Sequence, residues 1–366
     1  MHETPSIPLI RPLMPNLSDS IATFTSAALS GMLTNFGAIH ERLEKRLCKI
    51  TGGYAVPVST GTAAIEVALA VLGLEPGDRV LLPDFTHSGT ILAVVRAGLT
   101  PVLAGVDPKT WCLRPDEVEK VCREQRIDGV IVVSPFGYEV DVLAWDLLQD
   151  RAGFALVYDF AGAFGNFPKT IAPVCYSFHA TKNVGVGEGG MIVFRSERQA
   201  KHAKRLINFD TLSNREIASL RGSNSKLDEL KSSFLINSLS AIGLEAVEER
   251  IDAKRLTLDR YQEAFPQAYV PPGKKFPSLC VLGNLPAEAL EAASEREGIV
   301  FRRYYPLLSR MPALRDVERV SVSAEVMKNC CALPSDVDLG ETLRVVEVTR
   351  SYIAERKNHD NTGASA

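Results

Sequence analysis

The residues of this chain whose types are best suited to catalysis surround Lys182. This lysine follows the segment Ser177–Thr181 and is followed by the glycine-rich segment Gly185–Gly190. A lysine that forms an imine needs a pKa below its solution value of about 10.4, which burial or the imine itself provides. A phosphate-bearing aldehyde bound beside it also needs a hydroxyl and closely approaching backbone, which Ser177 and the glycines can supply. The pattern indicates a Schiff-base lysine.

A candidate phosphate site lies at Ser59–Ala64, with the sequence STGTAA. The segment follows an expected strand and opens an expected helix. Free backbone N–H groups and the helix dipole favour an anionic group at such a helix start. Thr62 adds a hydroxyl. An ordinary helix N-cap fits the same residues, so this segment by itself leaves both interpretations open.

Asp159 is a candidate partner for a cationic ring. It ends the apolar run Ala155–Tyr158, which places a carboxylate at the carboxyl edge of an expected strand, where open α/β sheets bind their ligands. A carboxylate there can pair with a protonated pyridine nitrogen and hold the ring cationic, so that the ring accepts electrons when a substrate carbon loses a proton. A helix N-cap aspartate is the alternative.

The glycine-rich segment does not predict a dinucleotide site. Gly185–Gly190 formally contains G-x-G-x-x-G, but that motif requires a strand before it and a helix after it. Here the apolar run Met191–Phe194 follows, which predicts a strand. We therefore reject the dinucleotide interpretation.

The elements that must position these residues alternate in type. Short runs rich in Val, Ile and Leu alternate with helical apolar spacing, which predicts buried, mostly parallel strands with helices on both sheet faces. The expected strands are 79–83, 100–106, 129–134, 155–159 and 191–194, and the expected helices include 62–74 and 115–125.

The character of the chain changes near residue 244. A charged helix (245–265), a strand near 279–282 and helices at 286–298 and 339–356 predict a smaller α+β domain. We expect an N-terminal arm and large α/β domain over 1–243, the small domain over 244–356, and a disordered polar tail over 357–366.

Composition excludes several classes of function. The net charge is −3 with 46% apolar residues, and the Lys and Arg residues are scattered, so no nucleic-acid partner is expected. Seven cysteines without a C-x-x-C pair disfavour a disulfide framework and a structural zinc site, so we expect no metal. No signal peptide or membrane segment is apparent, and a reducing cytoplasm is the expected location.

The order of the motifs is more informative than any one of them. Besides the segments above, the chain contains LTNFG at 33–37, PGDRV at 76–80, PDFTH at 83–87 and GSNSKLDE at 222–229. In this order, from about Pro12 to Arg350, the chain resembles the DegT/DnrJ/EryC1/StrS family of pyridoxal-phosphate (PLP) sugar aminotransferases. The resemblance implies the type I aminotransferase fold, α/β with a mostly parallel seven-stranded sheet.

The resemblance also implies a role for each matching position. It makes Lys182 the imine-forming residue and Asp159 the partner of the pyridinium nitrogen. His87, where the family usually has an aromatic residue, would stack on the ring. Further cofactor contacts would come from Gly61, Thr62, Ser177 and Asn224, and candidate substrate contacts from Thr34, Asn35, His179, Lys226 and Tyr304.

The implied assembly is at least a homodimer. In the family, the Gly-x-Asn segment reaches the neighbouring subunit's site, so Asn224 and Lys226 would act across the interface. Without the resemblance, Asn224 fits a turn cap and Lys226 a surface charge.

The implied reaction is amino transfer from glutamate or glutamine to a keto sugar nucleotide, with pyridoxamine phosphate as the intermediate cofactor form. The run RRYYPL at 302–307 resembles the branch that makes 4-amino-4,6-dideoxyhexose nucleotides. A 3-keto sugar or a cyclitol is a close alternative substrate. Dehydration of a nucleotide sugar is a second alternative, although relatives that dehydrate carry histidine in place of the lysine.

One position departs from the family pattern. Three residues after Asp159 the family commonly has His or Gln near the cofactor's phenolic oxygen, and this chain has Gly162. Phe160 also replaces the usual alanine, which we expect to reshape the same wall. Gly162 keeps a third hypothesis open, a PLP-binding regulator without turnover.

Overall fold

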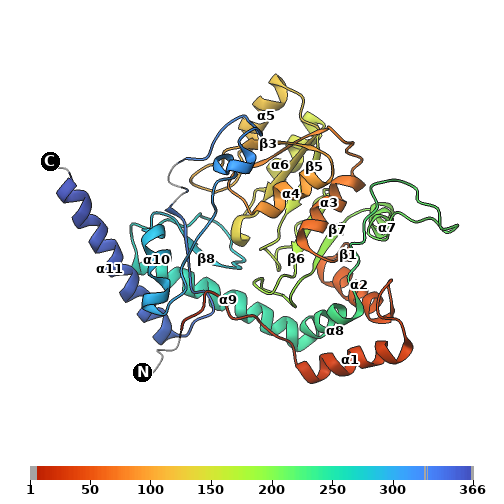
Figure 1. Cartoon of the computed structure of the whole chain (residues 1–366), viewed down its shortest axis with the longest axis horizontal. Coiled ribbons are helices and arrows are strands. Elements are labelled where there is room, and N and C mark those ends of the chain that lie inside the picture. The colour runs from red at the N-terminus through yellow and green to blue at the C-terminus, as the bar shows by residue number, and fades with distance from the viewer. Residues whose placement is uncertain (1–5, 325–326, 328, 364–366) are drawn as a thin grey trace.

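A central sheet organises the molecule in the computed structural model, which describes residues 6–324, 327 and 329–363. The strand order is β1-β7-β6-β5-β4-β2-β3-β10, with β7 antiparallel to both of its neighbours and the other pairs parallel. Figure 1 labels β1, β3, β5, β6 and β7 of this sheet. The strands are β1 Tyr54–Val58, β2 Arg79–Pro83, β3 Thr100–Ala104, β4 Gly129–Val133, β5 Ala155–Asp159, β6 Val174–Ser177, β7 Gly190–Phe194 and β10 Glu318–Arg319.

The sheet has eight strands, which corrects the expected seven. The additional strand, β10, comes from the C-terminal part of the chain and pairs with β3. Arg79 on β2 reaches across and binds both carboxylate oxygens of Glu318 at 2.8 Å. A two-residue strand is too short to produce a hydrophobic period, so only this long-range pairing reveals it.

Helices cover both faces of the sheet, as expected. One buried cluster includes Leu43, Val118 and Trp145 and lies under α2, α5, α6 and α8; the other includes Ala64 and Ile91 and lies under α3, α4 and α7. The helices up to residue 238 are α1 Leu17–Ser30, α2 Ala38–Thr51, α3 Gly61–Val71, α4 Ser88–Arg96, α5 Pro115–Glu124, the 3₁₀ turn η1 Pro135–Gly137, α6 Val142–Ala152, α7 Glu197–Leu206 and α8 Glu229–Ser238.

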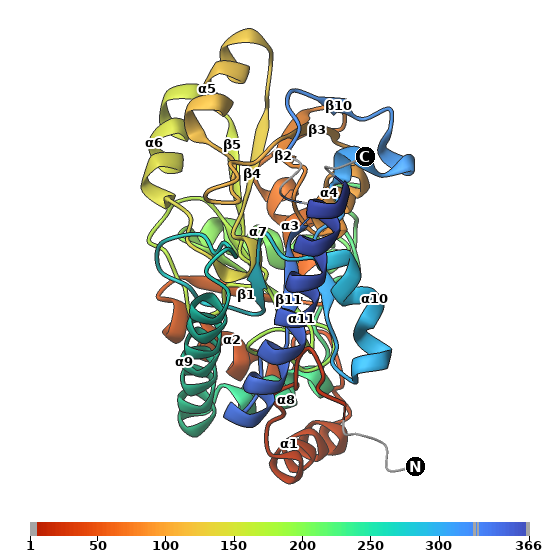
Figure 2. The same ribbon diagram turned by 90° about the vertical axis from the view of Figure 1, so that its left-hand side faces the viewer.

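The C-terminal part builds a smaller unit around the antiparallel sheet β8-β11-β9. Figure 2 labels β11 of this sheet and the helices α9, α10 and α11 of the same part. Its elements are α9 Ala241–Ala264, β8 Cys280–Leu282, α10 Ala287–Glu297, β9 Arg302–Arg303, η2 Leu308–Arg310, η3 Pro312–Leu314, β11 Cys331–Leu333 and α11 Leu339–Gly363. Its buried cluster also takes in Ile7 and Leu9 from the N-terminal arm and Phe85 and Trp111 from the larger part.

Two bounds differ from expectation in this region. Helix α9 begins at Ala241, so the expected domain boundary at 243/244 falls inside a helix. Helix α11 continues beyond residue 356, through Gly363, because an established helix adds one hydrogen bond for each further residue. Residues 357–363 of the expected disordered tail are therefore helical, and residues 364–366 lie outside the described part.

Within the described residues, no helix is long and apolar enough to cross a membrane. All seven cysteines are free thiols.

Candidate active site

The predicted site residues converge at one edge of the sheet. Strand β5 ends at Asp159 and β6 ends at Ser177. Because β7 runs antiparallel, its first residue, Gly190, lies opposite Ser177 and opposite Val58, the last residue of β1. The start of α3 therefore lies beside Ser177, and the candidate phosphate segment meets the candidate lysine segment at this edge.

Asp159 is a buried carboxylate, 5% exposed. Its Oδ2 accepts a hydrogen bond from Thr90 Oγ1 at 2.9 Å and its Oδ1 accepts one from the Ala161 N–H at 3.1 Å. Burial raises the pKa of Asp159, and these two hydrogen bonds and the charge of Lys182 only partly oppose that rise. The described residues form no ion pair with Asp159, and a cation bound beside it would favour its ionised form.

Lys182 lies in the turn between β6 and β7, where its backbone N–H donates to the His179 carbonyl at 2.8 Å. The side chain is only partly exposed. Desolvation lowers the pKa of Lys182, opposed by the charge of Asp159. The amine is thus more readily neutral than a surface lysine, as a nucleophilic amine requires.

The start of α3 is compact and capped. Thr60 Oγ1 accepts a hydrogen bond from the Ala63 N–H at 3.0 Å, so Thr60 is the N-cap. A Cβ on Gly61 would lie 2.9 Å from Ser177 Cβ, and one on Gly89 would lie 2.8 Å from Thr62 Oγ1. The Ser177 and Thr62 side chains therefore border the first helical turn, whose N–H groups have no intrahelical acceptor. This arrangement fits an anion as well as a cap.

His87 is the N-cap of α4, and its Nδ1 accepts a hydrogen bond from the Gly89 N–H at 3.1 Å. Its pKa is lowered by burial first and then by the charge of Lys182, whereas Asp159 raises it. Its ring meets the Tyr305 ring edge-on, with centroids 6.2 Å apart. The imidazole is therefore electrostatically coupled to both predicted catalytic residues.

The other predicted residues lie at varying distances from this centre. His179 Nδ1 is 2.8 Å from Thr181 Oγ1, in the same turn as Lys182. Lys226 Nζ donates to Asn224 Oδ1 and to Asn208 Oδ1 at 2.8 Å each and lies over the Phe209 ring.

The segment that carries Asn224 and Lys226 borders the end of β1. Ser59 N–H donates to the Ser225 carbonyl at 2.8 Å. Thr34 and Asn35 are exposed in the α1–α2 connection, and within the described residues neither hydrogen-bonds to Lys182 or Asp159.

Tyr305 rather than Tyr304 faces the centre of the site. Its ring stacks on Phe136 with centroids 4.8 Å apart and contacts His87. Burial raises the pKa of Tyr305, and the charges of Tyr304 and Asp159 add to that rise. Tyr304 contacts the Phe136 ring from the side. Two consecutive tyrosines in an irregular segment carry no sequence pattern that says which one points inward, so sequence reasoning missed Tyr305. It also missed Thr90, the hydroxyl donor to Asp159.

Gly162 has no room for the side chain that the family pattern expects. A Cβ there would lie 2.8 Å from Ser278 Oγ and 3.3 Å from the Gly137 nitrogen. A histidine or glutamine at this position would require Ser278 and η1 to move. Phe160 is fully buried in the core against Tyr158 and Tyr176.

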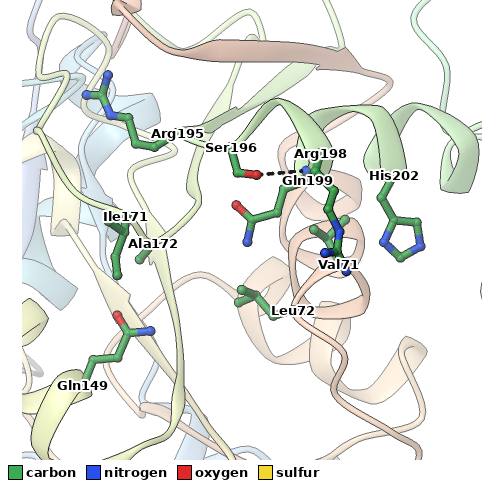
Figure 3. A pocket seen from close by; sticks show the side chains of 10 residues that line it. All are labelled: Val71, Leu72, Gln149, Ile171, Ala172, Arg195, Ser196, Arg198, Gln199 and His202. Atoms are coloured by element: carbon green, nitrogen blue, oxygen red, sulfur yellow. Dashed lines mark hydrogen bonds between the residues drawn. The ribbon is translucent and has the colours of Figure 1, made fainter.

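A cavity of about 590 Å³ lies elsewhere (Figure 3). It is bordered by Val71 and Leu72 at the end of α3, by Ala172 before β6 and by Arg195 after β7. These positions are at the opposite sheet edge from Asp159 and Ser177, and the cavity contains none of the predicted site residues.

Comparison with known proteins agrees with this geometry. The model of the DegT/DnrJ/EryC1/StrS aminotransferase family matches residues 17–350. The chain belongs to this family. The aminotransferases of this family are PLP-dependent, so the cofactor expectation is confirmed at the level of the family.

Curated relatives are of similar length. Protein Rv3402c of Mycobacterium tuberculosis is 29% identical over 360 residues, covering 90% of this chain and 85% of the relative. Protein Mb3436c of Mycobacterium bovis matches with the same identity and coverage.

Solved structures share the fold. S. venezuelae DesV, in complex with a ketimine intermediate, superposes with a TM-score of 0.83 at 23% identity, covering 95% of this chain and 99% of that one. DesI, in the presence of its TDP-sugar product, superposes with a TM-score of 0.84 at 23% identity, covering 97% of both. The expected fold class is thereby confirmed.

The residues present fit PLP. The buried Asp159 lacks a cationic partner among the described residues, and the narrow approach between Gly61 and Ser177 leaves N–H and hydroxyl donors at the start of α3. When bound, PLP supplies an aldehyde for the amino group and a ring that accepts electrons from the substrate carbon.

Proposed function

We propose that this aminotransferase moves an amino group from glutamate or glutamine to a keto sugar nucleotide, at the 4-position of a 4-keto-6-deoxyhexose. The family places the chemistry in amino transfer. The sugar assignment rests on the resemblance of residues 302–307 to the 4-amino-4,6-dideoxyhexose branch. It is compatible with DesI, whose structure contains a TDP-sugar product.

The proposal rests on the opposite pKa shifts of two neighbouring groups, Asp159 and Lys182. Burial raises the pKa of Asp159 and lowers that of Lys182. Asp159 would pair as a carboxylate with a pyridinium nitrogen and hold that ring cationic. Lys182 would bind the cofactor and, once released, move the proton between cofactor and substrate carbons. A positioned acid–base group of this kind typically contributes about 10² to 10⁴-fold in rate.

The remaining residues would bind and orient. Gly61, Thr62 and Ser177 would hold the phosphate, and His87 would stack on the ring while it caps α4. Tyr305 would border the site beside His87. Thr34, Asn35, His179, Lys226 and Tyr304 would contact the substrate, and His179 lies in the same turn as Lys182.

We further propose a cytoplasmic homodimer in which Asn224 and Lys226 complete the partner's site. This would account for Lys226, a partly buried cation whose partners in its own chain are amide oxygens rather than carboxylates. Burial lowers the pKa of Lys226. An anionic ligand from across the interface would offset that desolvation.

The test is the visible spectrum of the purified protein with PLP, before and after adding glutamate, with Lys182→Ala as the control. Amino transfer predicts a visible band that is absent from Lys182→Ala and that glutamate converts to the shorter-wavelength pyridoxamine form. A band that no amino donor shifts would instead support the PLP-binding regulator or non-transaminating PLP chemistry such as sugar dehydration.

A further inference from the structure

A fully buried lysine lies beside the proposed site without taking part in the chemistry described above. Lys254, on α9, is 0% exposed. Its Nζ donates to Asn183 Oδ1 at 3.1 Å and to the Ser278 carbonyl at 3.0 Å. It also lies 3.7 Å from Asp336 Oδ1. One ammonium thus joins three segments that are distant in sequence.

The first contact leads to Lys182. Asn183 is its immediate chain neighbour and is 1% exposed. The Asn183 Nδ2 donates to the Phe276 carbonyl at 3.4 Å, and its Oδ1 accepts from Lys254. Both the Nδ2 and the Oδ1 of Asn183 are hydrogen-bonded, so this side chain restrains the backbone next to Lys182.

The second contact leads to the wall at Gly162. Ser278 N–H donates to the Phe136 carbonyl at 2.9 Å, and Ser278 Oγ fills the space that a side chain at 162 would take. Phe136 in turn stacks on Tyr305. Lys254 therefore holds the Lys182 turn and this wall in one arrangement.

Stability alone does not explain a lysine at this position. Asp336 is already paired with Arg250, which donates to it from Nε and Nη2 at 2.8 Å each. Burial lowers the pKa of Lys254 to about 8, against the opposing charge of Asp336, and Arg250 lowers it further while the Cys280 thiol raises it. The buried ammonium therefore costs desolvation free energy, while Asp336 has Arg250 as its bidentate partner without it.

We propose that Lys254 is a positioning residue for Lys182, acting through the amide of Asn183. This inference rests on the proposed role of Lys182 as the residue that binds PLP. Without the Lys254 contact, the Asn183 amide loses the partner of its Oδ1, and the adjacent lysine samples orientations that do not reach the cofactor's aldehyde.

The test is a double-mutant cycle on PLP affinity in the full-length protein, measured by absorbance and by tryptophan fluorescence. We expect Lys254→Met and Asn183→Ala each to raise the PLP dissociation constant about tenfold. Because one acts through the other, the double variant should be about as weak as the weaker single variant, not about a hundredfold weaker.

Arg250→Met is the matched control. Arg250 lies one turn earlier on α9, is similarly buried and binds the same Asp336, but does not contact Asn183. The Arg250→Met variant should lower the melting temperature, as Lys254→Met does. It should leave the PLP dissociation constant within about twofold of the wild-type value.

The proposal would be overturned if the double variant raised the PLP dissociation constant by the product of the two single factors. It would also be overturned if Lys254→Met bound PLP as tightly as the wild type. If Lys254→Met does not fold, Asn183→Ala decides by itself: unchanged PLP affinity rejects the inference. PLP affinity is measured without any catalytic turnover. If the protein bound PLP but transferred no amino group, the proposed function would be wrong, and the affinity measurements would still test this inference.

Discussion

At the scale of single residues, burial raises the pKa of Asp159 and lowers the pKa of Lys182, each toward its neutral form. Asp159 receives two hydrogen bonds and no ion pair among the described residues, and its burial favours the neutral acid. A carboxylate so placed costs folding free energy until a cation arrives. In the proposed function, the cofactor's pyridinium would offset this cost.

Replacing Asp159 by asparagine should remove the folding free-energy cost of the buried carboxylate. The folded-state pKa of Asp159 is raised, so the folded state holds the proton more tightly, and stability falls as pH rises through that pKa. Without PLP, Asp159→Asn should melt higher than the wild type near pH 7 by about 1 to 3 °C, corresponding to about 1 kcal/mol. The difference should shrink toward acidic pH.

The same substitution should weaken PLP binding at least tenfold, because a neutral amide does not stabilise a pyridinium. Thermal denaturation across pH and a PLP titration measure both effects. Unchanged PLP affinity in Asp159→Asn would remove this residue from the cofactor site.

At the scale of elements, the decisive feature is how closely α3 begins beside β6. Gly61 allows the first turn of α3 to approach Ser177, since a Cβ there would lie 2.9 Å from Ser177 Cβ. A helix start brought this close to a hydroxyl gathers the donors that a phosphate needs. Neither α3 nor β6 supplies all of these hydrogen-bond donors by itself.

Gly61→Ala should therefore push α3 away from β6, lower the melting temperature and raise the PLP dissociation constant about tenfold. Gly340→Ala is the control, because Gly340 also lies in a first helical turn and its Cβ would make an ordinary 3.4 Å contact with Asp338. Equal effects of the two substitutions on PLP affinity would contradict the phosphate site at α3.

At the scale of the whole molecule, the proposed site needs two chains. The segment that bears Asn224 and Lys226 borders the end of β1, with Ser59 bound to Ser225. If its side chains serve the partner's site, two defective variants should complement each other. Mixing Lys182→Ala with Asn224→Ala gives hybrid dimers with one intact site.

After unfolding and refolding together at equal concentration, this mixture should recover up to about a quarter of wild-type activity, since half of the dimers are hybrids with one of two sites intact. Activity in the mixture is compared with each variant refolded alone. No gain over the average of the separate variants would place Asn224 in its own chain's site or outside any site.

The chain by itself determined the elements that are local in sequence. Apolar runs predicted β2 and β5 with their observed bounds and β3, β4 and β7 to within two residues, because a buried strand must be continuously apolar. No bounds were predicted for β1 and β6. Residue chemistry singled out Lys182 and Asp159, and the order of the motifs indicated the family, which comparison confirmed.

The tertiary structure decided what depends on contacts between distant segments. The pairing of β10 with β3, the inward direction of Tyr305 and the Ser278 wall against Gly162 all join segments more than a hundred residues apart. The contact of Lys254 with Asn183 crosses 71 positions. Hydrophobic period and motif spacing report only on neighbours along the chain, whereas these contacts arise when packed layers bring separate segments together.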